Sequence, residues 1–172
     1  MKVNLQAVGK FAAEVEKNPA AGTKEKVVSG ECNFAEGQPH FSATIEFANG
    51  KATLSADNPP FMGGGGVAPD PVNYCLFGTA SCFAGTMMAI IAQRGLKVDK
   101  LTVSAHNRVN FHRALNLGKK PPVEEVWLKL DYSGEAAPQE MHEALNEALE
   151  TCPGAYCISH PIPLTAEVRK QS

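Results

Sequence analysis

The sequence predicts an α+β fold with an antiparallel-rich sheet and a long buried central helix. Three observations indicate this class. An amphipathic helix comes before any strand, the strands follow one another as hairpins, and an uncharged helix lies in the middle of the chain. No repeat or linker divides the 172 residues. We therefore expect one domain over 1–172, with an extra N-terminal helix over 1–20.

The first half of the chain begins with a helix expected over 3–17, because its apolar residues recur at helical spacing. An Asn-Pro pair then ends the helix. A strand is expected over 26–34. A second strand, over 40–48, alternates between apolar and polar residues, and Asn49-Gly50 predicts a tight hairpin into a third strand over 51–56.

A glycine-rich loop is expected over 57–69. The run from Gly63 to Gly66 raises the possibility of a phosphate cradle, but the Lys-Ser/Thr pair that ends such a loop is absent. We therefore expect a flexible surface loop. Replacing Gly64 and Gly65 with serine would then change the melting temperature little.

The central helix is expected over 71–93, which are 23 residues without a charge. Asp70 suits the N-cap, Pro71 suits the first helical position, and Gly95 suits the C-terminal stop. The segment has membrane-spanning length. Because it contains polar residues and glycines among half-polar strands and amphipathic helices, we expect a helix buried in a globular core and no membrane partner.

The second half of the chain is expected to form two strands, over 100–111 and 123–132, each with one apolar face. A helix begins at Pro138 and carries one apolar stripe. We expect it to end at Cys152-Pro153-Gly154, and a last short strand to follow over 163–168.

Composition and charge exclude several functions. The chain is 44% hydrophobic and 20% charged, its formal net charge is −2, and it has only four arginines. We therefore expect no nucleic-acid partner. The five cysteines are an odd number, and the N-terminus lacks the apolar run of a signal peptide, so we expect a cytoplasmic protein. No hydrolase triad, paired-carboxylate motif or dinucleotide fingerprint is present, and we expect no bound cofactor.

The cysteines are the candidate reactive groups. Cys82 lies among small residues that allow close approach to its sulfur, although a buried inert cysteine would fit the same pattern. Cys75 lies two helical turns earlier, about 10 Å along the helix axis, which is too far for a disulfide. Cys152, Cys157 and His160 have roughly the spacing of metal ligands, but a tetrahedral site needs a fourth. Candidates for it are Cys82, His106 and His112; we expect no metal, and we expect the histidines at the surface.

An ordered set of motifs resembles the signature of the OsmC/Ohr family. Pro69-Asp70-Pro71-Val72-Asn73-Tyr74 follows the glycine-rich loop, and Gly78-Thr79-Ala80-Ser81-Cys82 follows a few residues later. Arg94-Gly95-Leu96 and the late helix closing on Cys152-Pro153 fit the same order. The resemblance covers about 26–168.

The resemblance implies an intertwined homodimer with the central helices buried together, and a thiol-dependent hydroperoxide reductase. In that chemistry Cys82 is the peroxidatic cysteine, which becomes a sulfenic acid. Cys152 is the resolving cysteine that condenses with it to a disulfide, and Cys157 is the alternative resolver. An external dithiol then reduces the pair. A nearby resolving thiol protects a sulfenic acid from further oxidation.

The sequence departs from this pattern at the two groups that activate the family's cysteine. No arginine precedes Arg94, and Val72 occupies the position of the family's glutamate. We therefore expect a raised pKa for Cys82, unless Lys26, Lys51 or His40 replaces the missing cation. A second hypothesis follows, in which the same fold binds a small apolar ligand near Cys82 and the cysteines are structural.

Overall fold

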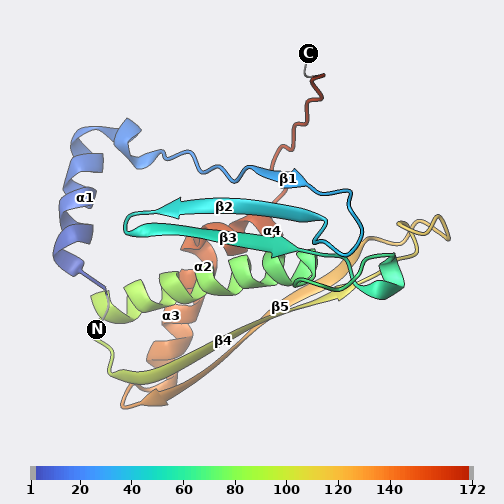
Figure 1. The fold of residues 1–172 in the computed structure, drawn as a ribbon. Helices are drawn as coiled ribbons and strands as arrows, with labels where there is room; N and C mark the ends of the chain where they lie inside the picture. The colour runs from blue at the N-terminus through green and yellow to red at the C-terminus, as the bar shows by residue number, and fades with distance from the viewer. Residues whose placement is uncertain (1–2, 171–172) are drawn as a thin grey trace. The chain divides into compact units, whose positions relative to one another are not determined.

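The computed structural model describes residues 3–170. The chain forms two compact units, an N-terminal unit up to Phe77 and a C-terminal unit from Gly78 onward. Figure 1 labels the helices and strands of both. The single domain remains a prediction, and each unit is described by itself.

The N-terminal unit begins with α1 (Leu5–Lys17), which confirms the predicted helix. The Asn4 side chain caps it by accepting a hydrogen bond of 3.0 Å from the Ala7 N–H. A short 3₁₀ helix, η1 (Pro19–Gly22), follows. The first strand, β1 (Gly30–Cys32), is much shorter than predicted, because only these three residues pair with β2.

The predicted hairpin is confirmed by β2 (Phe41–Phe47) and β3 (Gly50–Ala56), which pair antiparallel. Its turn residues are Ala48 and Asn49, one position earlier than expected, because Gly50 already pairs with Phe47. On the polar face, the hydroxyls of Ser42 and Ser55 hydrogen bond at 2.9 Å. The β1–β2–β3 sheet is thus antiparallel, as the alternating sequence predicts.

The glycine-rich loop is mostly exposed, as predicted for a surface loop, but hydrogen bonds to a buried carboxylate hold it in place, which argues against the predicted flexibility. Asp57 is 3% exposed, and its Oδ2 accepts hydrogen bonds from the N–H groups of Gly65 (3.0 Å) and Val67 (3.1 Å). The short 3₁₀ helix η2 (Pro60–Met62) lies within the loop. A Cβ at Gly64 would overlap the carbonyl of Asn58. The loop therefore needs glycine for close packing, and a serine at Gly64 is expected to destabilise it.

The central helix α2 (Pro71–Gln93) matches its predicted bounds. The Asp70 carboxylate accepts the Val72 N–H at 2.7 Å, as an N-cap does. At the other end Gly95 has φ +65°, and hydrogen bonds from Leu96 N–H to Ile91 O (3.0 Å) and from Gly95 N–H to Ala92 O (3.2 Å) close a Schellman motif.

The helix is long and apolar enough to cross a membrane by length and composition. Soluble core helices pass the same test, and here the buried residues all lie in its second half: Phe83, Met87, Ile90, Ile91 and Ala92.

The C-terminal unit contains the antiparallel strands β4 (Val98–Val109) and β5 (Val123–Gly134), followed by α3 (Pro138–Thr151) and α4 (Pro153–Ser159). Figure 1 shows the two strands as a long ribbon. Apolar side chains from one face of this ribbon pack against the buried residues of α2 and α3: Val98, Leu101, Val103, Leu128, Leu130 and Tyr132.

At the C-terminal end one helix was not predicted and one predicted strand is wrong. The Cys-Pro-Gly sequence ends α3 as predicted, but it also begins α4, because proline is as well suited to a first helical position as to a helix stop. The predicted strand over 163–168 is absent from the described residues, where 161–170 have no regular structure. Two prolines close together, Pro161 and Pro163, remove N–H donors that strand pairing needs.

Candidate functional site

Two cysteines from distant parts of the sequence lie side by side in the C-terminal unit. The Sγ atoms of Cys82 and Cys152 are 3.6 Å apart, although the residues are 70 positions apart in the sequence. Both are free thiols. Cys82 is partly exposed on α2, whereas Cys152, between α3 and α4, is completely buried.

The local sequence explains how the second sulfur reaches the first. Cys152 is the N-cap of α4, with an extended backbone (φ −77°, ψ 119°), and Pro153 opens the helix. Gly154 then faces Cys82. A Cβ at Gly154 would lie 3.2 Å from Cys82 Cβ and 3.4 Å from Cys82 Sγ. The glycine therefore lets the start of α4 approach the central helix closely.

The two sulfurs differ in their ionisation. Burial raises the pKa of the Cys82 thiol, and a hydrogen bond from the Gly154 N–H opposes this only in part. Burial also acts to raise the pKa of Cys152, but hydrogen bonds from the Ala155 N–H and the Thr86 hydroxyl, together with the contact to Cys82, outweigh it and lower that pKa. The raised pKa of Cys82 confirms the expectation from its missing cation. Of the two thiols, Cys152 is therefore the one that loses its proton more readily.

Thr86 links the two cysteines. Its hydroxyl lies one helical turn after Cys82 and donates to the Cys82 carbonyl oxygen at 3.1 Å. The same hydroxyl can donate to the Cys152 sulfur. Because a hydroxyl carries one hydrogen, it serves one acceptor at a time. Ionised Cys152 is the stronger acceptor of the two.

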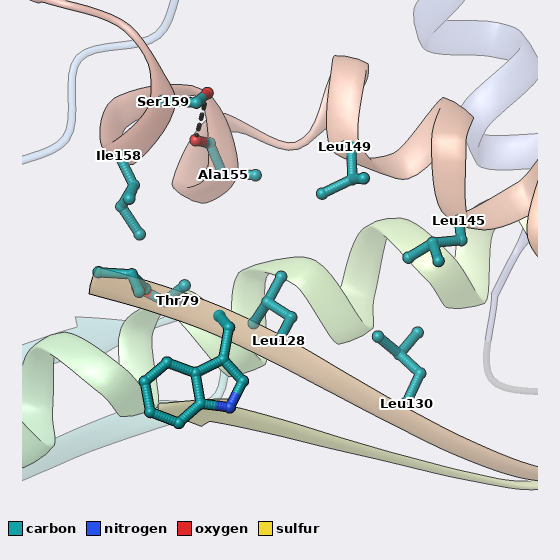
Figure 2. Close-up of a pocket in the computed structure, with 10 residues that line it drawn as sticks. Thr79, Leu128, Leu130, Leu145, Leu149, Ala155, Ile158 and Ser159 are labelled. Carbon is teal, nitrogen blue, oxygen red and sulfur yellow. Dashed lines mark hydrogen bonds between the residues drawn. The ribbon is translucent and has the colours of Figure 1, made fainter. Parts of the chain in front are cut away.

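An apolar pocket of about 580 Å³ lies next to the cysteine pair. Thr79, one turn before Cys82, and Ala155, which donates to Cys152, both line it. Figure 2 shows leucines from α3 opposite leucines from β5 across the pocket: Leu145 and Leu149 on one side, Leu128 and Leu130 on the other. A ligand of small apolar character fits such a lining.

The other candidates from the sequence lie elsewhere. Cys157 is exposed on α4, and its charge acts on Cys82 only as a further influence that raises the pKa. His160 stacks on Tyr156 at 4.1 Å. Within residues 3–170, no group of three or more metal-ligating side chains is found.

The residues considered as substitutes for the missing arginine belong to the N-terminal unit. There His40 Nδ1 lies 3.4 Å from Asp57 Oδ1. Lys26 and Lys51 are in the same unit. The expectation that His106 lies at the surface is wrong. Its ring stacks on Trp127 at 5.0 Å, because the two residues pair across β4 and β5, and its Nε2 is buried.

Sequence reasoning missed three groups that act on the sulfurs: Thr86, Gly154 and Ala155. The signal for the last two was present, since a proline after a cysteine is a favourable first helical position and directs the next N–H groups back toward the N-cap. No sequence pattern marked Thr86, because its role depends on a residue 66 positions later in the chain, Cys152.

Comparison with known proteins supports the family assignment. The family model described as OsmC-like protein matches residues 63–167. No curated protein matches significantly.

Solved structures share the fold at low sequence identity. An organic hydroperoxide resistance protein OsmC from Legionella pneumophila has a TM-score of 0.58 and 17% identity, covering 80% of this chain and 92% of that one. A putative osmotic stress induced and detoxification response protein from Psychrobacter arcticus has a TM-score of 0.59 and 19% identity, covering 81% and 91%.

An organic hydroperoxide resistance protein from Elizabethkingia anophelis has a TM-score of 0.55 and 18% identity, covering 80% and 91%. These likenesses confirm the α+β architecture with antiparallel sheets. The family model spans more than half of the chain and contains both sulfurs of the pair. This chain belongs to the OsmC-like protein family.

Proposed function

We propose that the protein is a thiol-dependent hydroperoxide reductase in which Cys82 is peroxidatic and Cys152 is resolving. The observation that carries this proposal is the 3.6 Å separation of a partly exposed and a buried sulfur. A hydroperoxide can reach the exposed sulfur, and the buried one is already within van der Waals contact of it. Cys157, which is exposed farther along α4, is the less favoured resolver.

The chemistry needs no bound cofactor. Cys82 attacks the distal peroxide oxygen, the O–O bond breaks, and the products are a sulfenic acid and an alcohol. Cys152 then attacks the Cys82 sulfur and expels the sulfenic oxygen as hydroxide, which leaves a disulfide. An external dithiol returns both cysteines to the reduced state by thiol–disulfide exchange.

The apolar pocket supports an organic hydroperoxide as the substrate, because its leucine lining suits an alkyl or aryl group and two of its lining residues, Thr79 and Ala155, are near the cysteines in sequence. The same observation favours the second candidate function, the binding of a small apolar ligand without turnover.

The proposed assembly is a homodimer. The first half of α2 has no buried residue within one chain, and Phe77 on it is 68% exposed. A helix without charge is poorly suited to water over that length, so a second copy would bury it. We expect light scattering at micromolar concentration to give the mass of a dimer. A monomer mass would contradict this proposal. The cytoplasmic location remains a prediction.

One experiment separates the two functions. The reduced protein is treated with cumene hydroperoxide, remaining thiols are alkylated, and peptides are analysed by mass spectrometry. We expect a Cys82–Cys152 disulfide and turnover with a dithiol. Cys82→Ser should reduce turnover to background, whereas Cys32→Ser, on an exposed strand, should not. Turnover that survives Cys152→Ser and fails in Cys157→Ser would make Cys157 the resolver. No peroxide consumption, with unmodified Cys82, would leave the ligand-binding function.

A further inference from the structure

In the Cys82–Cys152 pair, the more accessible cysteine is not the one that ionises more readily. The sulfur that a hydroperoxide can reach, Cys82, belongs to the thiol that burial keeps protonated. The sulfur that the surrounding groups favour as a thiolate, Cys152, is completely buried. Only a thiolate is an effective nucleophile. The exposed cysteine must therefore lose its proton during the attack, and a nearby group must take it.

We propose that Cys152 is the catalytic base of the peroxide reaction as well as the resolving cysteine, because its sulfur is 3.6 Å from Cys82 Sγ, within hydrogen-bond distance of the Cys82 thiol. This inference rests on the proposed function. It accounts for the absence of an arginine before Arg94 and of a glutamate at Val72, since the activating group comes from the late helix instead.

In this mechanism Cys152 transfers the Cys82 proton to the leaving group. As the Cys82 sulfur bonds to the distal peroxide oxygen, its proton passes to the Cys152 thiolate. The O–O bond breaks, and the leaving alkoxide takes that proton from Cys152 and departs as the alcohol. Cys152 is again a thiolate, and it attacks the sulfenic sulfur of Cys82. The sulfur–oxygen bond breaks, hydroxide leaves, and the disulfide forms.

The groups around Cys152 support a thiolate at this position. The Ala155 N–H donates to its sulfur, and so can the Thr86 hydroxyl and, when it does not donate to Cys82, the Gly154 N–H. When the Thr86 hydroxyl does not donate to the Cys152 sulfur, it donates to the Cys82 carbonyl oxygen, at 3.1 Å. Thr86 is therefore a positioning residue, which acts through Cys152 and does not contact the peroxide.

The test measures the first step alone, as loss of one equivalent of cumene hydroperoxide in a single turnover at neutral pH. A cysteine that only resolves has no influence on this step. We expect Cys152→Ser to slow it by about 100-fold or more, the size of general base catalysis. Cys32→Ser, which removes an exposed cysteine of β1, should leave the rate unchanged.

Thr86 provides a second pair of variants in case Cys152→Ser does not fold. Thr86→Val should slow the first step by about tenfold, the effect of one hydrogen bond to a charged group. Thr86→Ser restores the hydroxyl and should restore the rate. The ultraviolet absorbance of thiolate, measured without peroxide, should fall in Thr86→Val and in Cys152→Ser, and should persist in Cys82→Ser.

The outcomes separate the inference from the proposed function. A wild-type protein that reduces peroxide, with an equal first step in Cys152→Ser or, where that variant does not fold, in Thr86→Val, would overturn the role of Cys152 as base and keep the reductase. Thiolate absorbance that disappears in Cys82→Ser would also overturn it. A wild-type protein that consumes no peroxide would overturn both, even where the absorbance places the thiolate on Cys152.

Discussion

Asp57 in the N-terminal unit and Cys152 in the C-terminal unit are both buried groups that backbone N–H donors favour in the charged form. Gly65 and Val67 donate to the carboxylate, and Ala155 donates to the sulfur. In each case the pKa is lowered although burial opposes it. The two regions thus use the same electrostatic device.

The neighbours of the two groups differ. The second oxygen of Asp57 faces His40, at 3.4 Å, and the carboxylate orders the glycine-rich loop around it. Cys152 faces a second thiol, which belongs to the partly exposed residue Cys82. A buried charge that accepts backbone hydrogen bonds therefore has a structural role at Asp57, where it orders a loop. At Cys152 the same arrangement can take part in a reaction, because a second thiol lies next to it.

The largest expected effect concerns the loop around Asp57. Gly64→Ala places a Cβ on the carbonyl of Asn58, and the backbone must move. We expect a loss of about 1–3 kcal/mol in the free energy of unfolding, measured by chemical denaturation. Gly9→Ala is the matched control, because nothing lies within 4 Å of that Cβ and alanine favours the helix. Equal stabilities of Gly64→Ala and wild type would show that the loop is mobile after all.

The contrast between this loop and the central helix shows what sequence could predict. Caps and turn residues act locally, so Asp70, Gly95 and the β2–β3 hairpin were predicted close to their observed positions. The order of the loop depends on Asp57 meeting N–H groups 8 and 10 residues later, which no local pattern reveals.

The candidate site was predicted only in part for the same reason. Family resemblance indicated Cys82 and Cys152, but their contact joins residues 70 positions apart. The ionisation of the pair depends on α4, a helix that was not predicted, because the Cys-Pro-Gly sequence was expected only to end α3. The groups that set the chemistry are therefore found only from the folded arrangement.

A second prediction tests the charge on Asp57. Its pKa is lowered mainly by the Val67 N–H, against the effect of burial, so the folded state holds the carboxylate longer than the unfolded state as the pH falls. The stabilisation is fully present above the unfolded value of about 3.9 and is lost as the pH falls through the lower folded pKa. We expect Asp57→Asn to lower the melting temperature at neutral pH.

The same variant should flatten the acid side of the stability profile, measured by thermal denaturation at a series of pH values. Turnover per folded molecule should stay unchanged in Asp57→Asn. A steep acid loss that persists in the variant would assign it to another carboxylate.

A third prediction tests how closely α4 approaches the reactive sulfur. Gly154→Ala adds a Cβ at 3.4 Å from Cys82 Sγ, so one of the two elements must shift by a few tenths of an ångström. We expect disulfide formation after peroxide to slow by about tenfold, because small misplacements of reacting groups carry large costs. Gly118→Ala, whose Cβ would lie 3.9 Å from His112, should react like wild type. An unchanged rate in Gly154→Ala would mean that the sulfurs adjust freely.

The smallest expected effect concerns the contribution of His40 to the Asp57 carboxylate, compared with that of the backbone N–H groups. His40 is 38% exposed at its side chain and its Nδ1 is 3.4 Å from Asp57 Oδ1, which is long for a charged hydrogen bond. A long contact with a partly exposed imidazole contributes little, so we expect His40→Ala to change the melting temperature by no more than about 2 °C at neutral pH. His40→Gln keeps a donor and is the control. A drop as large as that of Asp57→Asn would mean that the imidazole, and not the amides of Gly65 and Val67, holds the carboxylate. The parallel with Cys152, whose charge depends on backbone donors, would then fail.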